Sequence, residues 1–126
     1  MKDVLKEMLV NAKKAMANAY NPYSGIAVGA CIRSTKLYVG CNIENVSYSI
    51  TLCAEASAIA AMISAGSKRI SEVLIVSNQE YVITPCGACR QRLIEFANPD
   101  VKVHMFSCNE DYQVMTVGEL LPCAFE

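Results

Sequence analysis

The chain has 126 residues, of which 53% are hydrophobic and 18% are charged, and its formal net charge at pH 7 is −1. A chain of this length has room for one hydrophobic core, so we expect a single domain over residues 1–126. The near-neutral charge provides no basic surface for a nucleic-acid backbone, and we expect no nucleic-acid partner. The charged fraction is below the roughly 25% that is typical of proteins, which favours a second apolar surface buried in a homo-oligomer.

The sequence also disfavours membrane insertion and export. Its longest apolar run, residues 56–66, is far shorter than the about 18 residues that span a bilayer, and Ser57 and Ser64 interrupt it. The first residues mix both charges and contain no apolar signal core. We therefore expect no membrane partner and a cytoplasmic location, with the seven cysteines present as thiols or metal ligands rather than disulfides.

Hydrophobic periodicity predicts alternating helices and strands. Apolar residues at helical spacing predict a first helix over residues 4–20, which Asn21 and Pro22 end. The other expected elements are strands at 26–32 and 37–42, a helix at 54–65, a strand at 73–76, a helix at 86–97, strands at 101–106 and 112–115, and a capped helical turn at 116–119. This order predicts an α/β fold, a three-layer α/β/α sandwich around one mixed five-stranded sheet.

Three cysteines occur where two of these helices begin. Cys86 and Cys89 are three residues apart, so their sulfurs share one helix face and can share a metal. Cys53 opens the preceding helix, and helix N-termini favour thiolates. Three thiolates leave the fourth position of a tetrahedral zinc site open, as in catalytic zinc sites. Glu55 would then lie beside the metal without being needed as a ligand, placed to move protons.

A Cys-x-x-Cys pair alone is also compatible with a redox dithiol, or with part of a structural zinc site in a non-catalytic module. A closed structural site takes a fourth protein ligand, and no further Cys or His has suitable spacing. We expect the remaining cysteines to be small buried hydrophobic residues: Cys31, Cys41, Cys108 and Cys123. His104 is expected to be an ordinary strand residue.

The order of the motifs is specific. Cys53-Ala54-Glu55 precedes a Pro-Cys-x-x-Cys motif at residues 85–89, which matches the signature of zinc-dependent deaminases. The chain resembles the small homotetrameric cytidine deaminases of the cytidine and deoxycytidylate deaminase family. Further stretches carry this resemblance: residues 23–30, 40–48, 85–91 and 116–122.

The resemblance implies a reaction and a cofactor. One zinc ion per chain would be held by Cys53, Cys86 and Cys89, and Glu55 would be the catalytic proton shuttle. The reaction implied is hydrolytic deamination of cytidine and deoxycytidine to uridine and deoxyuridine, with release of ammonia, in pyrimidine salvage.

The resemblance also implies substrate-binding residues. Asn42 and Glu44 would bind the sugar hydroxyls, and the backbone at Ala54 would contact the pyrimidine. Phe125 would cover the pyrimidine in a neighbouring subunit, and Tyr48 would lie near that interface. The implied partner is therefore a second copy of the chain in a tetramer with shared active sites.

Three positions depart from the family pattern. Ile26 stands where phenylalanine is frequent, which predicts weaker nucleoside binding, and Val46 replaces an alanine at the pocket rim. Ala56 replaces a common arginine, so the helix N-termini and Arg90 would have to offset the negative charge of the zinc–thiolate group. We expect the zinc-bound water to have a higher pKa than in relatives with the arginine. Because these positions alter the pocket, an alternative substrate is a different 4-aminopyrimidine, such as an aminonucleoside antibiotic.

Overall fold

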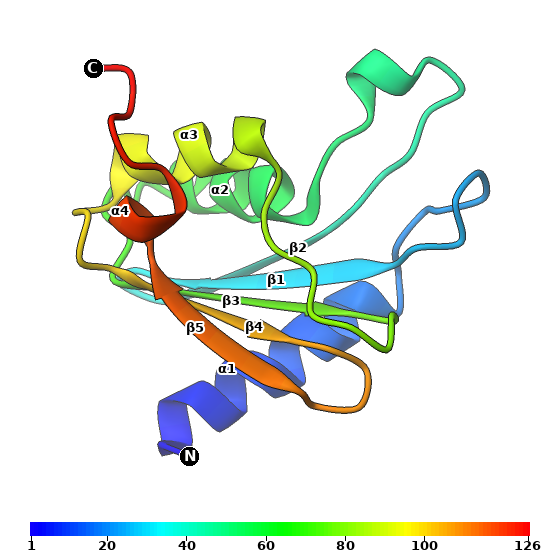
Figure 1. The fold of residues 1–126 in the computed structure, drawn as a ribbon, viewed down its shortest axis with the longest axis horizontal. Coiled ribbons are helices and arrows are strands. Elements are labelled where there is room, and N and C mark those ends of the chain that lie inside the picture. The colour runs from blue at the N-terminus through cyan, green and yellow to red at the C-terminus, as the bar shows by residue number, and fades with distance from the viewer.

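The structure is a computed structural model that describes residues 1–126, and it is built on one five-stranded sheet (Figure 1). The strand order is β2-β1-β3-β4-β5, in which only β3 and β4 run parallel to each other. The strands are β1 (Val28–Arg33), β2 (Leu37–Cys41), β3 (Glu72–Ser77), β4 (Lys102–Phe106) and β5 (Tyr112–Thr116). The predicted mixed five-stranded sheet is therefore confirmed.

Helices cover both faces of the sheet. One face packs against α1 (Asp3–Met16), and the other carries α2 (Ala54–Ser64) and α3 (Gly87–Phe96) (Figure 1). The chain closes with the short helix α4 (Val117–Leu120). None of the helices combines the length and apolar character needed to cross a bilayer.

The central strand β3 contributes to both halves of the core. Val73 and Ile75 pack into the cluster beneath α2 and α3, whereas Leu74 and Val76 pack into the cluster beneath α1. Successive side chains of a strand point to opposite faces, so a strand between two helical layers must be apolar at consecutive positions. This arrangement confirms the three-layer α/β architecture.

One local prediction needs correction, and one short element was not predicted. The first helix ends at Met16, not near Tyr20, because the N–H of Tyr20 donates to the carbonyl of Asn42 and Tyr20 bridges to Ile43 instead of continuing the helix. A 3₁₀ turn, η1 (Tyr48–Ile50), lies in a stretch for which the sequence predicts neither helix nor strand. The capping box is confirmed at Thr116, whose side chain accepts from the N–H of Glu119.

The cysteines outside the motifs occupy different environments. Cys31 is buried under α1 and Cys41 is half-buried, whereas Cys108 and Cys123 are exposed. The expectation that all four are buried is wrong for the last two, because both lie outside the strands and helices that build the core.

His104 is a structural residue of β4. It is buried, and its ring nitrogens lie 2.6 Å from a carboxylate oxygen of Glu72 and 2.7 Å from the hydroxyl of Tyr112. Both polar atoms of the ring are thus used within the sheet, as expected for a satisfied strand histidine.

Gly40 on β2 determines how closely α2 approaches the sheet. A Cβ at this position would lie 2.6 Å from the carbonyl oxygen of Ala54 and 2.7 Å from Cβ of Ser57, and closer still to the backbone N of Ala58. These atoms belong to the first turns of α2, which follow directly after Cys53. The glycine therefore sets the position of the helix start that carries the metal-binding motif.

We predict that Gly40→Ala destabilises the protein by about 2 kcal/mol or more, because an added methyl in a tight contact forces backbone displacement. Urea unfolding measures the loss. The control is Gly87→Ala, where a Cβ meets nothing within 4 Å and helix propensity rises. Equal stability of Gly40→Ala and the wild type would contradict the close approach.

Candidate active site

The three motif cysteines converge at the starts of two helices. Cys53 is the N-cap residue of α2, Cys86 is the N-cap residue of α3, and Cys89 follows in the first turn of α3. Their sulfur atoms all lie within 4.8 Å of one another, and Sγ of Cys53 is 3.7 Å from Sγ of Cys86. Zinc–sulfur bonds of about 2.3 Å in a tetrahedron separate the sulfurs by about 3.8 Å. The donor set and its spacing therefore fit a zinc ion held by three thiolates.

Hydrogen bonding among the thiols favours a thiolate at Cys53. The hydrogen bond from Cys89 lowers the pKa of Cys53 to about 6, with a smaller contribution from Cys86 and against the opposing effect of burial. The pKa of Cys89 is raised by this shared hydrogen bond and by burial. One ligand is thus prepared to ionise, and metal binding would displace the proton that Cys89 retains.

Glu55 lies in the first turn of α2, two residues after Cys53, and only 4% of its surface is exposed. Burial raises the pKa of this carboxyl group to about 7. The first turn of a helix lets the side chains of residues 53 and 55 reach one site in front of the helix end, as expected from the sequence. A carboxyl group in this position can exchange protons with a reactant near the thiols.

A cavity of about 270 Å³ opens beside the thiols and Glu55. It brings together most of the residues expected at the site: Ile26, Asn42, Glu44, Cys53, Ala54, Glu55 and Cys86. Its wall also contains residues that the sequence motifs did not indicate: Ser24, Val28, Thr51, Ile75, Ile83 and Thr84. The apolar patterns of β1 and β3 identify Val28 and Ile75 as core residues. Only their nearness to strand ends could have indicated that they also line a cavity.

Asn42 and Glu44 reach the cavity from the segment that follows β2. The amide of Asn42 donates to the carbonyl of Ile26 (2.8 Å) and accepts from the N–H of Val28 (2.9 Å). The carboxylate of Glu44 accepts from the hydroxyl and N–H of Ser24 and from the N–H of Tyr23, and the Ser24 hydroxyl foremost holds the pKa of Glu44 below its usual range. Both side chains are therefore fixed in place, and each retains lone pairs or a second N–H for a ligand.

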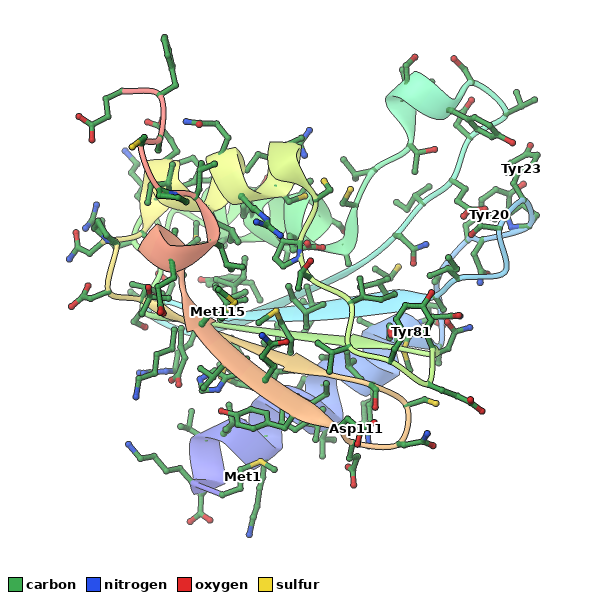
Figure 2. The ribbon with its side chains drawn as sticks, in the orientation of Figure 1. Met1, Tyr20, Tyr23, Tyr81, Asp111 and Met115 are labelled. Carbon is green, nitrogen blue, oxygen red and sulfur yellow. The ribbon has the colours of Figure 1, made fainter.

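Three residues expected at the substrate do not line the cavity of their own chain. Val46 and Tyr48 are each 77% exposed, and Phe125 is 86% exposed. The first two belong to the arm between β2 and α2, which carries η1 and projects from the body at the upper right (Figure 1). Figure 2 shows Tyr20 and Tyr23 on the neighbouring segment after α1, and the ring of Tyr23 lies 6.5 Å from that of Tyr48 on the arm.

The two arginines of α3 have different partners. Arg90, which was expected to offset the thiolate charge, donates instead to the carbonyls of Pro85 and Leu120. Arg92 was not singled out from the sequence, yet its Nη1 lies 3.4 Å from Sγ of Cys89. The three-residue spacing of Cys89 and Arg92 on one helix was the available signal.

Comparisons with known proteins agree with this geometry. Residues 2–105 match the family model for the cytidine and deoxycytidylate deaminase zinc-binding region. A cytidine deaminase of Sporosarcina psychrophila is 39% identical over 123 residues, covering 96% of this chain and 90% of the relative. The crystal structure of cytidine deaminase from Burkholderia pseudomallei superimposes with a TM-score of 0.91 at 36% identity, covering 99% of this chain and all of that one. A more distant match is a blasticidin-S deaminase of Bacillus cereus, 31% identical over 108 residues that cover 78% of this chain and 76% of the relative.

The chain therefore belongs to the cytidine and deoxycytidylate deaminase family, in which the sequence motifs had placed it.

We predict that Asn42→Ala lowers the free energy of unfolding by about 2 kcal/mol, because two hydrogen bonds to the backbone of β1 and the segment before it are lost. Urea unfolding of the metal-free protein is the measurement. Asn98→Ala is the matched control, since the Asn98 side chain bonds only the exposed Arg69. If both variants lose the same stability, Asn42 does not anchor the cavity wall.

Proposed function

We propose that this protein is a zinc-dependent deaminase that converts cytidine and deoxycytidine to uridine and deoxyuridine with release of ammonia. The observation that carries the proposal is a cluster of three thiols, two of which, Cys53 and Cys86, line one cavity together with the buried Glu55, while Cys89 lies buried behind them. Cys53, Cys86 and Cys89 would hold the metal. Three protein ligands leave one tetrahedral position for a reactant, whereas a structural zinc site would need a fourth protein ligand that this cluster does not contain.

Each group of the site then has a chemical task. Zinc, when bound, supplies Lewis acidity that makes water a nucleophile near neutral pH. Glu55 accepts the proton of the attacking water and delivers it to N3 of the pyrimidine, which makes C4 electrophilic. The oxygen adds to C4, and Glu55 takes the remaining proton of the new C4 hydroxyl and passes it to the amino group. The C4–N bond then breaks to give ammonia as the C4 carbonyl forms. One water is consumed, and Glu55 returns to its starting protonation state.

The sugar would be bound at the other end of the cavity. Glu44 is a carboxylate held by backbone and hydroxyl donors, and its free lone pairs can accept from sugar hydroxyls. Asn42 offers its second N–H beside it. The backbone at Ala54 faces the same cavity and would contact the pyrimidine.

A second substrate class is another 4-aminopyrimidine nucleoside. The cavity has aliphatic walls at Ile26, Val28, Ile75 and Ile83, and a flat aromatic side chain is missing from it. The match to a blasticidin-S deaminase supports this alternative, at lower identity than the match to cytidine deaminases. Glu44 and Asn42 favour a substrate with a hydroxyl-bearing sugar, and we therefore give cytidine precedence.

We predict that the zinc-loaded protein deaminates cytidine, and that Glu55→Gln lowers kcat by at least about 100-fold, because the amide cannot carry the proton. Loss of cytosine absorbance together with ammonia release measures the reaction. Zinc content and the urea midpoint of the variant must match the wild type. No turnover of cytidine, deoxycytidine or blasticidin S by the zinc-loaded wild type would contradict the proposal, and turnover of blasticidin S alone would select the second substrate class.

The active protein would be a homotetramer in which neighbouring chains complete each site. Support comes from exposed apolar residues on the arm, Val46, Tyr48 and Ile50, which a single chain leaves in water. Gln91 of α3 donates to the carbonyl of Phe125, whose side chain is exposed and does not line the cavity of its own chain. The site that Phe125 would cover therefore belongs to a neighbouring chain.

We predict complementation between two defective chains if Phe125 acts in a neighbour. Phe125→Ala should raise KM, and Glu55→Gln should abolish turnover. Unfolding and refolding an equal mixture should restore about one fully native site in four, because such a site combines Glu55 of one chain with Phe125 of the other. Recovery is measured as turnover at low cytidine concentration. If the refolded mixture is only as active as the two variants refolded separately and then combined, Phe125 does not act between chains.

The proposed setting is cytoplasmic pyrimidine salvage. A three-thiol site needs its cysteines reduced until the metal binds, and reduced thiols persist in the cytosol. All seven cysteines are free in the structure.

A further inference from the structure

The Arg92 side chain places a fixed positive charge against the thiol cluster. Its Nη1 is 3.4 Å from Sγ of Cys89, and the two residues lie three positions apart on α3. Cys89 is completely buried, while Arg92 reaches it from the exposed side of the helix. A guanidinium keeps its charge at every pH at which the protein folds, so this contact does not depend on titration.

No other cation hydrogen-bonds a thiol of the cluster. Arg90, on the same helix, is held by Pro85, Leu120 and Thr84. Position 56, directly after Glu55, is a buried alanine. Among the lysines and arginines, only Arg92 is therefore placed to balance the cluster at short range.

The cluster needs such a charge once it holds a metal. Three thiolates with a divalent ion carry a net negative charge, and a buried net charge without a partner is costly. A donor to a ligand atom also fixes the orientation of that ligand. Outer partners of metal ligands typically contribute 10–100-fold to metal affinity.

We propose that Arg92 is a positioning residue that holds the Cys89 thiolate and thereby retains zinc in the site. The inference rests on the proposed function in one respect, that the three thiols hold the ion. It assigns to α3 the charge compensation that an arginine at position 56 would supply from α2.

The test is the rate at which the zinc-loaded protein releases its metal to an excess of a chromogenic chelator. Arg92→Met keeps an unbranched apolar stem and removes the charge, and it should release zinc about tenfold faster. Arg92→Lys keeps the charge and should restore a rate within about threefold of the wild type. Arg69→Met is the control, because Arg69 bonds Asn98 at the surface and should leave the rate unchanged.

A stability measurement separates charge compensation from a general loss of structure. The metal-free forms of Arg92→Met and the wild type should unfold at the same urea concentration, and Arg92→Gln provides a second neutral variant should the first fold poorly. Zinc release at the wild-type rate from both neutral variants would overturn the inference, as would equal acceleration in Arg69→Met. A wild type that takes up no zinc would overturn the proposed function and the inference together, whereas a zinc-loaded wild type with unaffected variants would overturn the inference alone.

Discussion

The convergence of two helix N-termini is the constraint on which the site depends. Cys53 and Cys86 are the N-cap residues of α2 and α3, and 33 positions of sequence separate them. Their sulfurs meet only if both helices start at the same place on one face of the sheet. Free N–H groups and the helix dipoles favour negative charge at that place, so the thiolates and the fold stabilise each other.

The sheet supplies this alignment. β1 and β3 lie side by side in its centre, and β2 carries Gly40, which lets α2 pack without a spacing side chain. A shift of α2 by the width of a methyl group would move Cys53 and Glu55 together. The same end of the sheet carries Asn42, whose amide joins the segment after β2 to the start of β1. The three thiols, Glu55 and the cavity wall are therefore positioned by the close approach of α2 at Gly40 and by the hydrogen bonds of Asn42.

Much of this arrangement could be predicted from the sequence, because hydrophobic periodicity and capping residues act on the segment in which they occur. The consecutive apolar residues of β3 indicate a strand buried on both faces, and the capping box at Thr116 indicates the last helix. The zinc-binding cysteines follow from their spacing and from the motif order. The gathering of Asn42, Glu44 and Ala54 around one cavity followed from the family resemblance, not from periodicity.

Other features depend on packing that no local pattern encodes. Arg90 is held by the carbonyls of Pro85 and Leu120, and Leu120 belongs to α4, so the orientation of this side chain depends on a contact that is distant in sequence. The end of α1 is set by a backbone bond from Tyr20 to the distant Asn42. The exposure of Cys108 and Cys123 depends on where the chain leaves the core, which hydrophobic composition alone does not report.

The central claim is a metal site with three sulfur ligands and one open position. X-ray absorption spectroscopy at the zinc edge of the purified, metal-loaded protein tests it most directly. The expected result is three sulfur neighbours at about 2.3 Å and one oxygen or nitrogen neighbour at about 2.0 Å. Four sulfur neighbours would indicate a closed structural site and contradict the claim, as would a coordination shell with fewer than three sulfurs.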